Sequence, residues 1–295
     1  MTNLIAKLGE TRALIDDHLN TLLPLTTGKE VRVIEAMRYS ILGGGKALRP
    51  FLVLTISEML GVEKQNALQV ACALEMVHTY SLIHDDLPAM DNDTMRRGKP
   101  TNHIQFDEAT AILAGDGLLT KAFEVLSMPQ THKDAIIRCK LISHLAKASG
   151  IQGMIAGQMI DLIGEKTPLS LDEIERMQTL KTGALLRYAC TAPAIMVQES
   201  GLIFKSLETY ASTIGLMFQI TDDILDVEGD SVIVGKTLGK DKQAQKSTFV
   251  SMLGIDTAKK NVQILAQKAE NALSCFGENA DLLHQTVHFI LTRNK

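Results

Sequence analysis

Two clusters of aspartates are the residues whose types and spacing are best suited to chemistry. In the first, His84-Asp85-Asp86-Leu87-Pro88-Ala89-Met90-Asp91-Asn92-Asp93, four carboxylates fall within nine residues. Pro88 disfavours helix at the residue before it and turns the chain, so Asp91 can return towards Asp85. Carboxylates from a helix end and from the following turn would then converge. Oxygen ligands of this kind suit Mg²⁺ or Mn²⁺ better than zinc.

The second cluster, Asp222-Asp223-Ile224-Leu225-Asp226, lies inside an apolar segment. On a helix, Asp222 and Asp226 share one face, and Gln219 lies one turn earlier. Two carboxylates about 5 Å apart repel by roughly 3 kcal/mol at an effective dielectric constant near 20, so facing clusters need cations between them. Magnesium usually completes its shell with phosphate oxygens. A substrate diphosphate that bridges the two clusters would supply them.

Basic residues lie near both clusters and in glycine-bearing segments. Guanidinium and ammonium groups suit phosphate oxygens, and glycines let backbone N–H groups approach the same anion. Any one of these charges alone is typical of a solvated surface, and a lone histidine is typical of a core. Together they exceed what one metal-bound diphosphate requires, which indicates two anionic substrates. The basic residues are Lys46, Arg49, His78, Arg96, Arg97, Lys181 and Lys236, and Gly45 lies beside Lys46.

Long helices must position these groups. The chain has seven prolines and no tryptophan, and its long stretches of Ala, Leu, Met, Glu, Gln and Lys favour helix. Apolar residues recur at helical spacing in four segments, and Ser170, three residues before Glu173, predicts a capping box. The four predicted helices are Ala67–Leu82, Leu171–Val197, Ser206–Val227 and Thr257–Cys275, and the predicted loops are Gly98–Pro100, Gly164–Pro168 and Gly229–Gly239.

We expect one all-α domain over residues 1–295, because no repeat, linker or shift in composition divides the chain. The segments 68–82 and 211–227 are apolar nearly all round, which predicts that they lie centrally. A net charge of -4 gives no basic field for nucleic acid. Four scattered cysteines, no signal-like N-terminus and no membrane-length apolar run predict a soluble cytoplasmic protein without stable membrane insertion.

In their order along the chain, these motifs resemble those of the trans-isoprenyl diphosphate synthases, and within that family those of the bacterial farnesyl diphosphate synthases. The similarity runs from Gly43 to about Phe249, and the motifs are Gly-Gly-Lys, Asp-Asp-Leu-Pro-Ala-Met-Asp, Arg-Arg-Gly-Lys-Pro-Thr, Lys-Thr-Gly, Phe-Gln-Ile-Thr-Asp-Asp-Ile-Leu-Asp and Lys-Ser-Thr. The resemblance implies a polyprenyl synthetase domain of about ten core helices around a central cavity. It also implies a homodimer that uses Mg²⁺, about three ions per active site, with Mn²⁺ able to substitute.

The resemblance also assigns a role to each matching residue. The implied metal ligands are Asp85, Asp91 and Asp222, supported by Asp86 and Asp226. The allylic diphosphate would be held by Arg96, Lys181, Thr182, Gln219 and Lys236, and Lys246 would also bind substrate. Isopentenyl diphosphate would be held by Gly45, Lys46, Arg49, His78 and Arg97. Ala47 departs from the family, which commonly has arginine there, so one possible phosphate contact is lost.

Chain length is expected to depend on Tyr80 and Ser81, which precede Asp85 by about one helical turn. A growing isoprenoid tail would run down this face, and the phenol ring of Tyr80 would form a floor. A core aromatic ring without this role is the competing interpretation. The resemblance favours the floor, because an aromatic residue five positions before the first aspartate, together with the Pro88-Ala89 insertion, goes with a C15 product.

Other activities remain open at this point. A geranylgeranyl or geranyl diphosphate synthase would use the same motifs for a different chain length. A class I terpene cyclase shares the aspartate-rich metal chemistry but handles one diphosphate, which leaves Lys46, Arg49, His78 and Arg97 unexplained. A non-catalytic subunit of a prenyl synthase would be expected to have lost aspartates, and both clusters are intact here.

Overall fold

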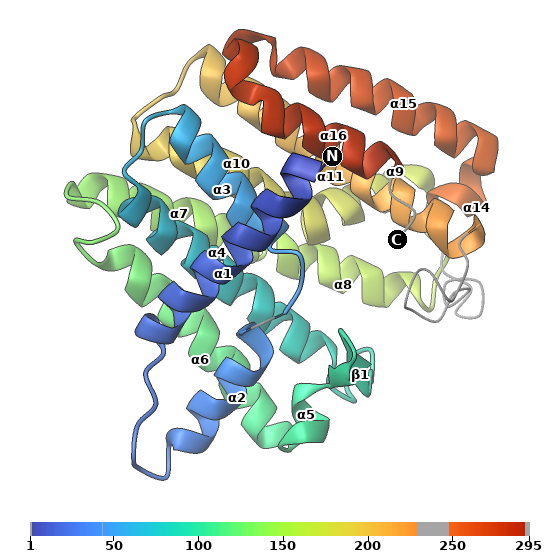
Figure 1. The fold of residues 1–295 in the computed structure, drawn as a ribbon. Helices are drawn as coiled ribbons and strands as arrows, with labels where there is room; N and C mark the ends of the chain where they lie inside the picture. Colours follow the sequence, from blue (N-terminus) through green and yellow to red (C-terminus); the bar gives the residue numbers. More distant parts are fainter. Residues whose placement is uncertain (1, 43, 229–247, 293–295) are drawn as a thin grey trace. The chain divides into compact units, whose positions relative to one another are not determined.

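A computed structural model describes residues 2–42, 44–228 and 248–292. Within these ranges the chain is almost entirely helical, with one short two-stranded hairpin, so the predicted all-α class is confirmed (Figure 1). The residues form two compact units. Of the described residues, the N-terminal unit contains 2–42, 44–143 and 195–197, and the C-terminal unit contains 144–194, 198–228 and 248–292. The single domain expected from the sequence stays a prediction.

The N-terminal unit is built from helices and the hairpin. Its elements are α1 (Thr2–Leu22), α2 (Val31–Ile41), α3 (Leu48–Met59), α4 (Lys64–Asp85), β1 (Met95–Arg96), β2 (Lys99–Pro100), α5 (Asn102–Gln105), α6 (Glu108–Ser127) and the first part of α7 (Ala135–Ser149). Helix α4 contacts α1, α2, α3 and α6. Its buried residues include Leu68, Val70, Leu74, Met76 and Val77. The prediction that this apolar helix lies centrally is therefore confirmed for its own unit.

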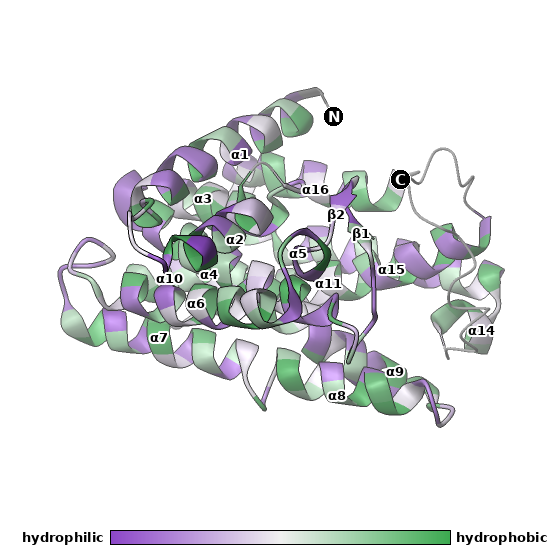
Figure 2. Cartoon of the chain, turned by 90° about the horizontal axis from the view of Figure 1, so that it is seen from below, coloured by the Kyte–Doolittle hydropathy of each residue, from purple (hydrophilic) through white to green (hydrophobic). Residues whose placement is uncertain are grey.

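Helix α1 shows how the surrounding helices cover α4. Leu4, Leu8, Ile15 and Leu19 are buried, and their spacing of three to four residues, completed by Thr11, places them on one face. Hydrophilic and hydrophobic segments alternate along α1 in Figure 2. Burial of each large apolar side chain contributes about 1.5–3 kcal/mol, so this face holds α1 against α3 and α4.

The C-terminal unit packs α11 against α15 and α16. Its elements are α8 (Met154–Gly164), α9 (Leu171–Gln178), the π-helix η1 (Thr179–Gly183), α10 (Ala184–Met196, whose last two residues fall in the N-terminal unit), α11 (Leu202–Glu228), α14 (Phe249–Leu253), α15 (Ile255–Ala272), the 3₁₀ helix η2 (Ser274–Ala280) and α16 (Asp281–Thr292). Tyr210 of α11 is fully buried and donates a hydrogen bond of 3.1 Å to the carbonyl of Leu283 in α16.

The helix predicted over Leu171–Val197 is present but has an irregular centre. It begins at the predicted capping box, in which the backbone N–H of Ser170 donates to Glu173 at 2.8 Å. Between α9 and α10, residues Thr179–Gly183 form a π-helical turn. Single π-turns inside α-helices occur frequently at functional sites. The sequence pattern did not predict this turn.

Three other expectations need correction. The segment predicted as a loop at Gly98–Pro100 is part of the β1–β2 hairpin, whose turn residues Arg97 and Gly98 have φ of 54° and 75°. Two positive φ angles in a two-residue connection are typical of a type I′ turn, which matches strand twist. Gly164 ends α8 rather than starting a loop. The helix predicted over Thr257–Cys275 begins earlier, at Ile255, and gives way to η2 at Ser274.

The third predicted loop, Gly229–Gly239, lies outside the described residues. Among the described helices, none combines the length and the apolar character needed to cross a bilayer.

We expect Tyr210→Phe to lower the free energy of unfolding by about 1 kcal/mol, because one buried hydrogen bond to the carbonyl of Leu283 is lost while the ring still fills its space. Urea denaturation followed by circular dichroism measures this change. Ser212→Ala, an exposed change on the same helix, should stay within about 0.5 kcal/mol of the wild type. Equal stability of Tyr210→Phe and the wild type would contradict the assigned contact.

Candidate active site

The first acidic cluster forms a compact turn at the end of α4. Helix α4 ends at Asp85, the residues before Pro88 leave the helix, and the backbone N–H of Asp91 donates to the carbonyl of Asp85 at 2.9 Å. The N–H of Asn92 closes the same turn on the carbonyl of Leu87 at 3.1 Å. The predicted return of Asp91 towards Asp85 is confirmed. Asp85 is half-buried and Asp91 is exposed, so both carboxylates belong to one accessible turn.

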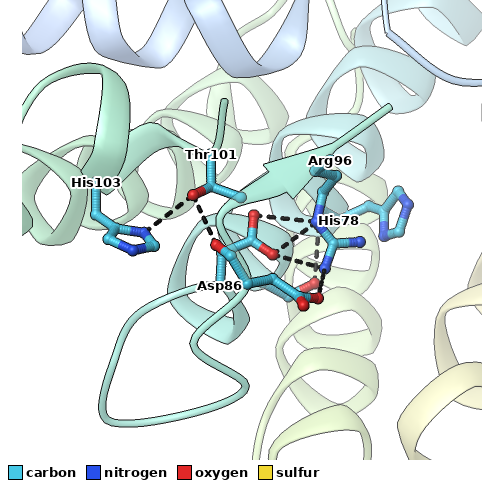
Figure 3. Close-up of polar contacts among 7 residues, drawn as sticks. His78, Asp86, Arg96, Thr101 and His103 are labelled. Carbon is cyan, nitrogen blue, oxygen red and sulfur yellow. Dashed lines mark hydrogen bonds and ion pairs between the residues drawn. The ribbon is translucent and has the colours of Figure 1, made fainter. Parts of the chain in front are cut away.

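Asp86 faces the hairpin and holds Arg96. The Nε of Arg96 donates to both carboxylate oxygens of Asp86, at 2.7 and 3.0 Å, and Nη2 lies 2.6 Å from Oδ1 (Figure 3). Burial raises the pKa of Asp86, and the hydrogen bonds and charge of Arg96 oppose that rise. A bidentate arginine–carboxylate pair fixes direction as well as distance. Asp86 therefore anchors the hairpin, and the predicted contact of Arg96 with diphosphate remains a prediction.

Thr101 fastens the base of the same hairpin. Its hydroxyl donates to the carbonyl of Asp93 at 2.7 Å and lies 3.3 Å from Nδ1 of His103 (Figure 3). Its backbone N–H donates to the carbonyl of Thr94 at 3.0 Å. These contacts close the base of the hairpin directly after the acidic turn.

A cationic cluster lies beside this turn in the same unit. An amino group of Arg49 is 3.2 Å from Nε2 of His78. The guanidinium of Arg97 lies against the glycine-rich loop, where a Cβ on Gly44 or Gly45 would come within 2.6 Å of it. Burial lowers the pKa of Arg49 to about 10 and, with the charge of Arg49, lowers the pKa of His78 well below its usual value. His78 is therefore neutral near pH 7, and its Nε2 accepts from Arg49.

Arg97, Arg96 and Asp86 also line a cavity of about 150 Å³. Gly44, Gly45 and residues near the end of α2 and α4 complete its wall. The structure thus places Gly45, Arg96 and Arg97 around this cavity, while Arg49 contacts His78 of α4. That these residues bind a diphosphate stays a prediction. Lys46 is exposed on the same loop.

The sequence analysis did not identify two residues of this cluster, Glu75 and Arg12. Glu75 is almost fully buried on α4, three residues before His78, and Arg12 reaches it from α1 with Nη1 3.2 Å from Oε1. Burial raises the pKa of Glu75, and the charges of Arg12, Arg49 and Arg97 oppose that rise. A single glutamate within the apolar run Ala67–Leu82 was a signal that could have identified it.

The two predicted chain-length residues lie one turn before Asp85. Tyr80 is 6% exposed, and its ring meets that of His84 edge-to-face, with centroids 5.7 Å apart. The hydroxyl of Ser81 donates to the carbonyl of His78 at 2.8 Å. Burial raises the pKa of Tyr80, so its phenol stays protonated near neutral pH.

In the C-terminal unit, α11 carries the second acidic cluster. Gln219, Asp222 and Asp226 are half-buried and lie at the predicted helical spacing on α11. Asp223 has a different role, because its carboxylate accepts the backbone N–H of Phe249, at the start of α14, at 2.8 Å. This contact joins the two described ends of the chain on either side of residues 229–247. Helical spacing had separated Asp223 from Asp222 and Asp226, but it did not predict the contact with Phe249.

Lys181 projects from the π-turn and is paired with Asp161 of α8, with Nζ 2.6 Å from Oδ2. Helix α8 approaches this turn closely at Gly157, where a Cβ would lie 2.2 Å from the backbone nitrogen of Lys181. Thr182, the next residue, is half-buried. Asp161 and Gly157 were not identified from the sequence. Lys236 and Lys246 lie outside the described residues.

Both acidic clusters supply carboxylate oxygens, which are the kind of ligand that Mg²⁺ binds. The turn supplies the carboxylates of Asp85 and Asp91, and α11 supplies Asp222 and Asp226 one helical turn apart. Within the described part of the chain, no group of three or more metal-binding side chains is gathered. Magnesium accepts few protein carboxylates and completes its shell with substrate phosphates and water, so pairs of this kind are appropriate donors.

Comparison with known proteins identifies the family. A family model of polyprenyl synthetases matches residues 30–285. Farnesyl diphosphate synthase of Micrococcus luteus is 47% identical over 264 residues, 90% of each chain, and geranylgeranyl diphosphate synthase of Cyanophora paradoxa is 40% identical over 99% of this chain and 97% of that protein. The crystal structure of an FPP/GFPP synthase from Zymomonas mobilis matches with a TM-score of 0.91 and 43% identity over 99% of both chains. The chain belongs to the polyprenyl synthetase family.

Proposed function

We propose that this protein joins dimethylallyl diphosphate, and then geranyl diphosphate, head-to-tail to isopentenyl diphosphate, and that it releases farnesyl diphosphate and pyrophosphate. The observation that carries the proposal is the pairing of two kinds of anion site at the end of α4. A carboxylate turn suited to metal-bound diphosphate lies next to a cluster of arginines suited to direct binding of a second diphosphate. Farnesyl diphosphate synthases among the relatives support this substrate class.

Asp85, Asp91 and Asp222 would hold Mg²⁺, with Asp86 and Asp226 in support. When bound, Mg²⁺ supplies positive charge that stabilises the departing pyrophosphate. Lys181, held by Asp161 at 2.6 Å, would direct its ammonium group to the allylic diphosphate. Thr182 and Gln219 would donate to the same group, together with Arg96, Lys236 and Lys246.

Isopentenyl diphosphate would bind through Arg49, Arg97, Lys46 and the backbone at Gly45. Neutral His78 fixes the direction of Arg49 by accepting from it, which leaves the other donors of this guanidinium for phosphate oxygens. The double bond of isopentenyl diphosphate then attacks the allylic carbocation, and a proton leaves the product. The protonated phenol of Tyr80 is unsuited to accept this proton, so we assign it to the released pyrophosphate.

The apolar residues of α4 would exclude water from the carbocation, because water would convert it to an alcohol. Tyr80 is buried on this helix one turn before Asp85, where its ring would stop the growing tail after three isoprene units. A geranylgeranyl diphosphate synthase is the second candidate, favoured by the relative from Cyanophora paradoxa. We also propose a cytoplasmic homodimer.

The decisive assay combines the purified protein with Mg²⁺, isopentenyl diphosphate and either dimethylallyl or geranyl diphosphate. We expect C15 prenol as the main product after dephosphorylation, because Tyr80 limits the length of the tail. Chromatography of the prenols measures it. A main product of C20 would favour the second candidate. Hydrocarbon formed from farnesyl diphosphate alone would support a cyclase, and absence of any prenol of C10 or longer would refute the proposal.

Replacing Tyr80 with alanine should lengthen the product to C20 or beyond, because removal of the ring opens the end of the pocket. Tyr80→Phe is the matched control: it keeps the ring, removes the hydroxyl and should retain the C15 product. The same chromatography reports both variants. An unchanged product length in an active Tyr80→Ala enzyme would show that the ring is a core residue without influence on chain length.

Asp85→Asn should lower kcat by about a hundredfold or more, which corresponds to roughly 3 kcal/mol of lost transition-state stabilisation. It should also raise the Mg²⁺ concentration needed for half-maximal rate, because a neutral amide is a poorer ligand. Initial rates at varied Mg²⁺ measure both effects. Asp17→Asn on α1, an exposed aspartate outside the cluster, is the control, and comparable rates in the two variants would exclude Asp85 as a metal ligand.

A further inference from the structure

Glu75 is a charged residue inside an otherwise apolar stretch of α4. It is 3% exposed, and its neighbours Leu74 and Met76 are fully buried. Taking a carboxylate out of water is unfavourable unless the charge is paired and hydrogen-bonded. A well-packed apolar side chain often serves stability as well as a buried ion pair does. Stability alone therefore does not account for a glutamate at this position.

Arg12 of α1 connects Glu75 to the glycine-rich loop. Its Nη1 lies 3.2 Å from Oε1 of Glu75 and donates to the carbonyl of Gly44 at 3.1 Å. Its other amino group pairs with Asp16, one turn along the same helix. Three separate segments, α1, the loop at Gly44 and α4, thus meet at one guanidinium.

The loop that Arg12 holds is the loop against which Arg97 packs. The guanidinium of Arg97 occupies the space that side chains at Gly44 and Gly45 would need. Arg49 bonds to His78, which lies three residues after Glu75 and so on the same face of α4. The charge of Glu75 acts on both Arg49 and Arg97.

Two arginines of the cluster also have N–H donors that make no hydrogen bond among the described residues. The Nε atoms of Arg12 and Arg49 are buried and make no hydrogen bond within the described ranges. Buried donors are normally satisfied, so this part of the unit is suited to receive an anion. Glu75 interacts with all three arginines and so reduces the repulsion among them, and it is not one of the described residues that line the cavity.

We propose that Glu75 and Arg12 are positioning residues for isopentenyl diphosphate: their ion pair holds the Gly44–Gly45 loop and sets the guanidinium groups of Arg49 and Arg97 in place for its diphosphate. The inference rests on the proposed function. Neither residue needs to touch the substrate. Loss of the pair would weaken the binding of isopentenyl diphosphate, whereas the binding of the allylic diphosphate would be little changed.

Glu75→Gln tests this assignment, since the amide keeps the shape and removes the charge. We expect the KM for isopentenyl diphosphate to rise about tenfold to a hundredfold, the effect of losing one hydrogen bond to a charged group. The KM for geranyl diphosphate should change by less than about threefold. Steady-state kinetics with each substrate varied in turn measures the difference.

Three further variants make the test specific. Glu124→Gln removes an exposed ion pair with Lys121, 2.7 Å long in the same unit, and should leave both KM values unchanged. Glu75→Asp keeps the charge and should recover part of the lost affinity. Arg12→Met should reproduce Glu75→Gln, and the double variant should be no worse than either single one, because both remove the same pair.

Thermal unfolding monitored by circular dichroism establishes that each variant is folded. An unchanged KM for isopentenyl diphosphate in folded Glu75→Gln and Arg12→Met would overturn the inference, as would an equal rise in both KM values. If Glu75→Gln does not fold, Arg12→Met and Arg12→Lys decide by the same criterion. A wild-type protein that makes no prenol would instead refute the proposed function.

Discussion

Positive charge gathered at one side of a buried apolar helix is the constraint on which the N-terminal unit depends. Arg12, Arg49 and Arg97 come from three segments of the chain, and their like charges repel one another. Glu75 offsets part of it from inside α4, and neutral His78 adds an acceptor without adding charge. Asp16 pairs with Arg12 as well. The guanidinium groups of Arg49 and Arg97 keep positive charge beside the acidic turn, and this charge would suit the second diphosphate of the proposed reaction.

The long helices could be predicted from the sequence because apolar spacing reports burial directly. Helix α4 and helix α11 are apolar nearly all round, and both have a row of buried residues along most of their length. The π-turn at Thr179–Gly183 could not be predicted in this way. Its two threonines and one glycine are weak helix formers, but low helix propensity does not specify a π-turn. The close approach of Gly157 to Lys181 arises from packing between α8 and the turn. Apolar periodicity does not report such a contact.

In the candidate site too, features set by neighbouring residues were predicted, whereas contacts between distant residues were missed. The return of Asp91 to Asp85 follows from Pro88 acting on its neighbours in sequence. The missed contacts join distant positions: Glu75 and Arg12 are 63 residues apart, Asp161 and Lys181 are 20 apart, and Asp223 and Phe249 are 26 apart. Residue type and local spacing predict which groups would bind phosphate or metal. The residues that orient those groups become visible only once the helices are packed.

Backbone strain at two residues near the glycine-rich loop supports the view that the arginine cluster is organised for binding. Ala47 and Arg97 have φ of 50° and 54°, in a region that costs a residue with a side chain of the order of 1 kcal/mol or more. Ala47 stands at the start of α3, two residues before Arg49, and Arg97 stands in the hairpin turn. A chain selected for stability alone would favour glycine at both positions. At position 97 glycine would remove the guanidinium that packs on Gly44 and Gly45. The strain at Arg97 therefore accompanies a charge that the proposed diphosphate site would use.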